Sequence, residues 1–198
     1  MRFGLISALL LALPALPAMA ERLPLSALSA YVNGLETARA QFTQIGEDGS
    51  LATGTLYIKR PGRMRFEYDP PNGALVVAGA SRVVIFDPKS NTPPESYPLR
   101  QTPLWLLLEP VVDLTRSDMV VGHAYDGTAT VVTAQDPERP GAGRIQLTFT
   151  ADPVALRKWV VTDETGARTT VIFQTLETGM SLGNALFDTG AVGAAPER

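Results

Sequence analysis

One serine motif and one histidine are the groups of this chain that could together perform nucleophilic catalysis. Residues 179–183 read GMSLG and match the letters G-x-S-x-G of the nucleophile elbow of serine hydrolases. That elbow follows a buried strand and opens a helix, and its histidine comes later in the chain. Here the only histidine, His123, precedes Ser181. We interpret the match as a turn rich in small residues and predict that the protein is not an enzyme. A lipid hydrolase acting through Ser181 is an alternative that Ser181→Ala would test.

The carboxylates of the chain are placed where they cap turns rather than where they converge on a site. Six aspartates lie at or near predicted turns, where such side chains bond the local backbone: Asp69, Asp87, Asp126, Asp136, Asp152 and Asp163. The sequence contains no HExxH motif, P-loop or EF-hand spacing, and it has no cysteine. We predict neither a metal nor a cofactor. The formal net charge of −3 argues against nucleic acid as a partner.

A single arginine stands at the end of an apolar strand face. Leu56 and Ile58 alternate with polar or amphipathic neighbours, which is the spacing of a strand, and Arg60 falls on the same face by parity. A guanidinium at the edge of an apolar face is costly unless it finds partners. The pattern therefore predicts an apolar face with one cation at its edge, which suits a protein that holds an apolar ligand.

The next strand repeats this alternation with charges on its other face. Met64 and Phe66 alternate with Arg63, Arg65 and Glu67. We expect the charged face to be solvated or to dock a partner, and the apolar face to join the binding cavity. Most apolar strand residues would serve as ordinary core in any barrel or sandwich. The residues predicted to line the cavity are Leu56, Ile58, Met64, Phe66, Leu75, Val77 and Phe149.

A short apolar block between prolines does not fit the sheet. Thr102 can cap a helix, Pro103 suits its first turn, and Pro110 ends it. A helix of one or two turns that is apolar on every side cannot lie on a wet surface. We predict that this block is a lid that covers the apolar face. Its members are Pro103, Leu104, Trp105, Leu107 and Leu108.

Around these residues the sequence predicts one helix followed by many strands. Apolar residues recur at helical spacing over 25–35. Short apolar runs separated by turn signals follow and indicate strands over 41–45, 53–60, 64–68, 75–78, 83–87, 119–125, 128–134, 144–150, 156–163 and 168–176. We therefore predict an α+β fold that is mainly β, with one meandering antiparallel sheet that curls.

The first twenty residues have the pattern of an export signal. Arg2 provides the basic start, residues 3–17 are mostly apolar, and Ala18-Met19-Ala20 is a small-x-small cleavage site. A retained anchor is the alternative, but the apolar run is short and interrupted by proline. Glu21 follows the site where a lipidated protein would have cysteine. We predict a cleavable signal peptide over 1–20 and a single domain over 21–198.

Several motifs in order resemble the periplasmic outer-membrane lipoprotein carrier family, LolA. Residues 42–44 read FTQ, residues 54–61 read GTLYIKRP, residues 102–107 read TPLWLL, and residues 163–166 read DETG. These match the family's F-x-Q, G-x-L-x-x-x-R-P and T-P-x-x-L-L patterns and a late turn before a strand rich in threonine and valine. The resemblance covers almost the whole chain after the signal. It departs near the end, where Phe187 lacks the second aromatic and the proline of the family pattern.

The resemblance implies an unclosed antiparallel half-barrel whose concave apolar face is covered by short lid helices. It implies a periplasmic, monomeric carrier of the acyl chains of lipoproteins, with Arg60 latching the lid through backbone carbonyls. The partners implied are acylated lipoproteins, the inner-membrane ABC transporter that releases them, and an outer-membrane receptor. The alternative is a sensor or regulatory lipid-binding domain on the same half-barrel.

Overall fold

The computed structural model describes residues 22–116 and 118–192. The predicted signal peptide, residues 1–20, lies outside the described residues. Of the helices in the described part, none is long and apolar enough to cross a membrane.

Strands dominate the described chain, as the alternating pattern predicts. The helices are α1 (Leu25–Gly34), α2 (Trp105–Leu108) and the short 3₁₀ turns η1 (Leu99–Gln101), η2 (Pro140–Ala142) and η3 (Asn184–Phe187). The strands are β1 (Thr37–Ile45), β2 (Leu51–Lys59), β3 (Arg63–Tyr68), β4 (Leu75–Gly79), β5 (Arg82–Phe86), β6 (Glu95–Pro98), β7 (Val120–Tyr125), β8 (Thr130–Gln135), β9 (Gly143–Thr150), β10 (Ala155–Asp163), β11 (Arg168–Phe173) and β12 (Glu177–Thr178).

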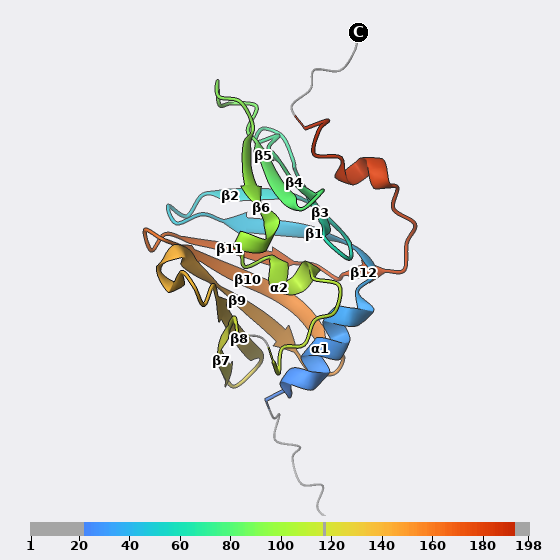
Figure 1. The fold of residues 1–198 in the computed structure, drawn as a ribbon, viewed down its shortest axis with the longest axis vertical. Helices are drawn as coiled ribbons and strands as arrows, with labels where there is room; N and C mark the ends of the chain where they lie inside the picture. Colours follow the sequence, from blue (N-terminus) through green and yellow to red (C-terminus); the bar gives the residue numbers. More distant parts are fainter. Residues whose placement is uncertain (1–21, 117, 193–198) are drawn as a thin grey trace, which may run out of the picture.

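All twelve strands belong to one antiparallel sheet that does not close. The order is β6-β5-β4-β3-β2-β1-β11-β10-β9-β8-β7, and β12 pairs with β1 beside β11. The pairing of β1 with β11 joins the early and late strands of the chain at the middle of the sheet. Figure 1 shows the sheet curling around α1 and α2. The predicted antiparallel half-barrel with helices over its concave face is confirmed.

The concave face holds one continuous apolar core. Leu56 lies opposite Phe66, and Ile58 lies opposite Met64, so the four side chains share this face. The side chains of α1 and α2 pack on them, with Leu28 and Leu108 fully buried. The far strands β8 to β11 contribute to the same core. The helices therefore bury the apolar face that an open sheet would leave in water.

Two predicted cavity residues lie on the opposite, convex face. Met64 and Phe66 pair with Ala78 and Val76, whereas Leu75 and Val77 pair with Glu67 and Arg65 and pack in a second, separate cluster. The prediction for Leu75 and Val77 was wrong because residues 75–78 are all apolar and give no alternation to read. The register that pairing with β3 imposes decides the face, and a shift by one residue exchanges the two faces.

The concave face is tightly packed around the middle of β2, at Gly54. A Cβ at Gly54 would lie 2.1 Å from the carbonyl oxygen of Glu67 and 2.8 Å from ring atoms of Phe42. We expect Gly54→Ala to lower the free energy of unfolding by about 1–3 kcal/mol. Gly34→Ala is the control, because a Cβ at this last residue of α1 would have no neighbour within 4 Å. Urea unfolding measures both, and an equal loss at both positions would contradict this packing.

Candidate functional site

The concave face keeps an open apolar cavity beside the lid. Its volume is about 430 Å³. The phenol of Tyr68 donates a hydrogen bond of 2.7 Å to Gln44 Oε1, and burial raises the pKa of Tyr68 to about 12, so this polar group stays neutral. The ring centres of Phe66 and Trp159 are 5.8 Å apart across the sheet. The lining residues are Gln44, Phe66, Tyr68, Val76, Ile85, Thr102, Pro103, Leu104, Ile145, Trp159, Val161, Thr169 and Val171.

The lid, residues 102–114, lies over the concave face (Figure 1). Its helix α2 is short, and Leu106, Leu107 and Leu108 are buried in the core. Thr102 does not cap α2 with its side chain, and instead its hydroxyl donates to the carbonyl oxygen of Leu99 at 2.8 Å. The apolar block therefore plugs the face because its leucines have no other place to leave water.

The predicted lid residues divide between the two sides of the lid. Pro103 and Leu104 line the apolar cavity, and Leu107 and Leu108 are in the core. Trp105 also borders a polar cavity on the other side of the lid, where its ring lies 4.6 Å from the guanidinium carbon of Arg100. A cation over an indole face is a favourable contact.

The predicted cavity residues differ in whether they are accessible from the cavity. Phe66 lines the apolar cavity. Leu56, Ile58, Met64 and Phe149 lie deeper, buried beneath α1 and the lid. In this structure those four residues belong to the core and do not line the cavity.

Arg60 ties the lid to α1. Its Nη1 donates to the carbonyl oxygen of Val32 in α1 at 2.6 Å. Its Nη2 donates to the carbonyl oxygen of Glu109 in the lid at 2.7 Å and to Asn33 Oδ1 at 3.2 Å. Arg60 Nε is buried and has no hydrogen-bond partner among the described residues. One guanidinium thus holds two segments that are far apart in the sequence.

Burial acts on both charged groups at this position. It lowers the pKa of the Arg60 guanidinium, and the nearby Glu109 carboxylate opposes that shift. Burial likewise raises the pKa of Glu109, against the attraction of Arg60 and Arg100. Arginine keeps its proton in proteins, so Arg60 remains a cation whose hydrogen bonds to carbonyl oxygens are charge-assisted.

Two further polar residues of α1, which sequence reasoning missed, hold the same end of the lid. Asn33 Nδ2 donates to the carbonyl oxygen of Val112 at 2.8 Å, and the Val112 amide donates back to Asn33 Oδ1 at 3.0 Å. The Leu114 amide donates to Ser29 Oγ at 3.0 Å. Ser29 lies beside Leu28 and Val32 on the buried side of α1, and that position was the signal available in the sequence. The sequence gives no such signal for Asn33, because a polar residue near the end of a helix is usually exposed to solvent.

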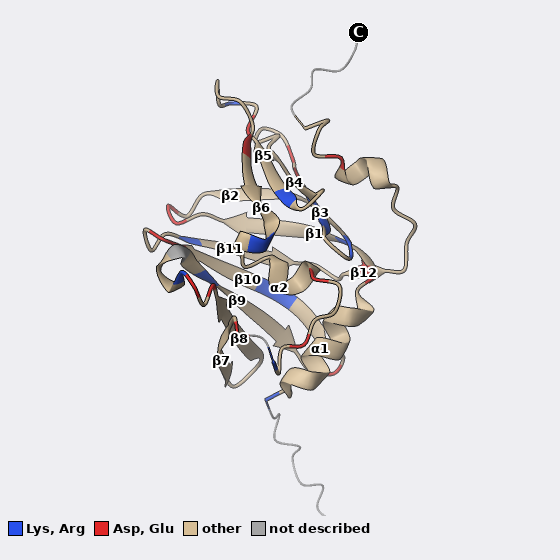
Figure 2. Cartoon of the chain, in the orientation of Figure 1, with Lys and Arg blue, Asp and Glu red and all other residues tan. Residues whose placement is uncertain are grey.

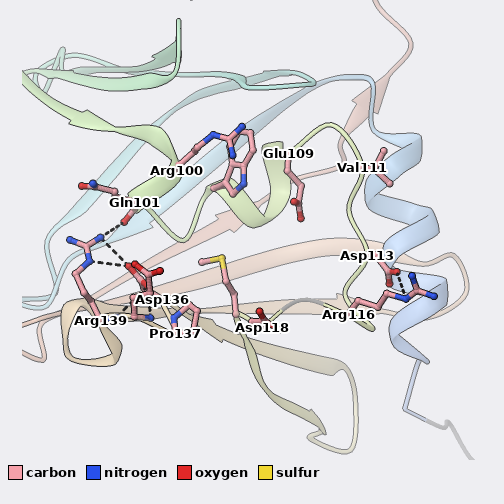
Figure 3. A pocket seen from close by; sticks show the side chains of 13 residues that line it. Arg100, Gln101, Glu109, Val111, Asp113, Arg116, Asp118, Asp136, Pro137 and Arg139 are labelled. Atoms are coloured by element: carbon pink, nitrogen blue, oxygen red, sulfur yellow. Dashed lines mark hydrogen bonds and ion pairs between the residues drawn. The ribbon is translucent and has the colours of Figure 1, made fainter.

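The outer side of the lid borders the larger, polar cavity of about 950 Å³ (Figure 3). Arg139 forms an ion pair of 3.0 Å with Asp136 and donates to the carbonyl oxygen of Gln101 at 3.4 Å. Arg116 and Asp113 form an exposed pair at 3.6 Å. Within residues 22–116 and 118–192 no group of His, Cys, Asp or Glu is placed to hold a metal ion.

The hydrolase motif does not assemble. Ser181 lies in an irregular segment between β12 and η3, so the strand–turn–helix of a nucleophile elbow is not formed. His123 lies on β7 at the sheet edge, where its Nε2 is 2.8 Å from the carbonyl oxygen of Leu23. The two residues therefore belong to separate structural contexts.

Residues 33–189 match a family model described as outer membrane lipoprotein carrier protein LolA. An outer-membrane lipoprotein carrier protein of Azotobacter vinelandii is 26% identical over 195 residues, which cover 94% of this chain and 92% of that protein. One of Chromohalobacter salexigens is 27% identical over 175 residues, covering 84% of this chain and 82% of that protein. A Xylella fastidiosa carrier is 34% identical over 96 residues, and this match spans 44% of the chain and less than half, 46%, of that relative.

Two solved structures are similar to this chain at low sequence identity. A DUF1329 family protein from Desulfovibrio piger has a TM-score of 0.52 and 12% identity, covering 85% of this chain and 96% of that one. A LolA superfamily protein from Nitrosomonas europaea has a TM-score of 0.44 and 9% identity, covering 86% of this chain and 100% of that one.

The buried side chains of α2 predict the effect of replacing one of them with a polar residue. Leu108 is 0% exposed, whereas Val111 in the same lid is 73% exposed. We expect Leu108→Ser to lower the free energy of unfolding by about 2–5 kcal/mol and to increase binding of a hydrophobic dye. Val111→Ser should leave both near their wild-type values. If the two variants behave alike, α2 does not close the apolar face.

Proposed function

Because this chain belongs to the LolA family of outer membrane lipoprotein carriers, we propose that it is a periplasmic carrier that moves lipoproteins from the inner to the outer membrane. The single observation that carries the proposal is the lidded apolar face, an open cavity continuous with a core that α1 and α2 cover. In this proposal the acyl chains of the cargo replace the lid on the concave face.

The size of the cavity requires the lid to move. About 430 Å³ is at the low end of the space that a drug-sized ligand occupies, whereas a lipoprotein anchor has up to three acyl chains. Displacing the lid adds the surface now covered by Leu106, Leu107 and Leu108. Each of these leucines loses roughly 1.5–3 kcal/mol of burial, while one acyl chain of about 16 carbons gains on the order of 10 kcal/mol. Relative to water, the three acyl chains of a lipoprotein together therefore outweigh the lid.

The hydrogen bonds from Arg60 to α1 and the lid, which we call the latch, favour release of the cargo. Opening the lid breaks the bonds from Arg60 to the carbonyl oxygens of Val32 and Glu109, and bonds to a charged group are worth about 1.5–3 kcal/mol each. These bonds form only in the closed state, so they oppose loading and favour discharge. Transfer depends on this difference between the two states.

The partners follow from the same proposal. The cargo is an acylated lipoprotein, the donor is an inner-membrane ABC transporter that releases lipoproteins, and the acceptor is the outer membrane, through a receptor where one exists. The carrier acts as a monomer, with no cofactor and no nucleic acid. The energy for loading comes from the donor.

Neighbouring residues on β11 provide a matched test of where the acyl chains lie. Val171 lines the apolar cavity, whereas Ile172 is 42% exposed on the other face. A photocrosslinking amino acid at Val171 should label a triacylated lipopeptide, and the same group at Ile172 should not. Equal labelling at both positions, or labelling at Ile172 alone, would place the lipid elsewhere and contradict the proposal.

Removing the latch should separate loading from release. We expect Arg60→Leu to fold and to capture a triacylated lipoprotein, but to deliver it to outer-membrane vesicles at least about tenfold less well, since the closed state loses its charge-assisted bonds. Arg168→Leu, at an exposed arginine that begins β11, is the control. Normal delivery by a folded Arg60→Leu protein would rule out the latch. Capture without release by the wild type would instead favour a sensor.

A further inference from the structure

Two cations of the convex face hold the C-terminal segment through one amide. Lys59 Nζ donates to Asn184 Oδ1 at 2.8 Å and to the carbonyl oxygen of Leu182 at 2.6 Å. Arg63 Nη1 donates to the same Asn184 oxygen at 3.0 Å. We call residues 180–192, which follow the last backbone bond to β1 (from the Gly179 amide to the carbonyl oxygen of Thr37), the C-terminal strap. Figure 1 shows the strap, in red, on the outside of the sheet.

A third cation of the same face binds the strap backbone. Arg65 Nη1 donates to the carbonyl oxygen of Leu186 at 3.0 Å, and Arg65 Nε pairs with Glu67 at 2.6 Å. In Figure 2 the basic residues of β3 are blue on this part of the sheet. The charged side of β3, which we expected to be solvated or to dock a partner, is thus a row of donors for a bound segment.

The strap also inserts an aromatic side chain into an apolar socket. Phe187 is 4% exposed and packs with Val77 and Val84, which face away from the lid. Gly79 lets the strap approach, because a Cβ there would lie 2.3 Å from the carbonyl oxygen of Phe187. We call the surface formed by the three cations and this socket the convex groove.

The strap lies on the sheet without joining it. In the described part of the chain, strand pairing at this end of the sequence stops at β12. Backbone amides of the strap bond within the strap, as from Leu186 to Gly183 and from Asp188 to Ala185. Its contacts with the groove are side-chain hydrogen bonds and apolar packing, so it can leave without breaking a strand pair. Segments held in this way open at low cost.

The charges of the groove are not matched by the strap. Asn184 places a neutral oxygen between Lys59 and Arg63, where a carboxylate would accept the same two bonds with charge assistance. Of the three cations, Arg65 has a carboxylate partner, which is Glu67 on the same strand. A peptide with an acidic residue at this position would be better suited to the groove than the strap itself.

We propose that the convex groove is a second binding site, for a short peptide segment of a partner protein that forms the same 3₁₀ turn as η3. That segment has an acidic residue where Asn184 lies and a large apolar residue where Phe187 lies, three positions later. The strap is a weaker internal competitor that covers the groove when no partner is bound. This site is on the opposite side of the sheet from the apolar cavity.

The test uses the full chain with a loosened strap and two labelled peptides. Phe187→Ser removes the anchor, and Ala185→Ser, at an exposed strap residue, is its control. One peptide has the sequence of residues 182–189, and the other has aspartate in place of Asn184. Fluorescence anisotropy should show the acidic peptide binding Phe187→Ser about five- to tenfold more tightly than the native one, and binding the control weakly. Adding Lys59→Gln to Phe187→Ser should remove most of that preference.

Equal binding of the two peptides to a folded Phe187→Ser protein, tighter binding of the native peptide, or no binding of either would overturn the proposal. Tighter binding of the native peptide would point to a second copy of this chain as the occupant. A second variant covers the case in which Phe187→Ser does not fold. Asn184→Asp in the otherwise native chain should slow hydrogen exchange of the strap amides by about five- to tenfold, and unchanged exchange would also overturn the proposal.

Discussion

The closed state of this protein depends on one half-buried guanidinium that must be satisfied at the end of an apolar sheet face. Arg60 cannot lose its charge, and leaving it unpaired in this position would be costly. Its partners are carbonyl oxygens of α1 and of the lid. Satisfying Arg60 therefore requires both covering segments to be in place at once. The lid closes for an electrostatic reason as well as an apolar one.

The two faces of the sheet are covered by the same physical means. On the concave side Arg60 binds backbone carbonyls of α1 and the lid. On the convex side Lys59 and Arg65 bind backbone carbonyls of the C-terminal strap. Neither cover adds a strand to the sheet. A cover held by long cationic side chains can leave while the strand ladder beneath it remains intact.

Much of the fold and part of the site follow from local patterns. Alternation in β2 and β3 identifies the concave faces of both strands, and the prolines around α2 identify the lid. Where the sequence shows no alternation, strand pairing decides which face of the sheet a side chain occupies. Residues 75–78 are uniformly apolar, and only their register with β3 places Val76 and Ala78 inside and Val77 outside. Trp105 resembles a lid residue, yet its ring also borders the polar cavity beneath Arg100.

The sequence by itself determined the antiparallel sheet, the covering helix, the isolated cation and the family resemblance, because each rests on residue types at short spacing. The tertiary structure alone decided which segments meet. The bonds of Asn33 with Val112 and of Asn184 with Lys59 and Arg63 join residues that are distant along the chain. No periodicity encodes such contacts, since they depend on how the whole sheet curls and on where its covers come to rest.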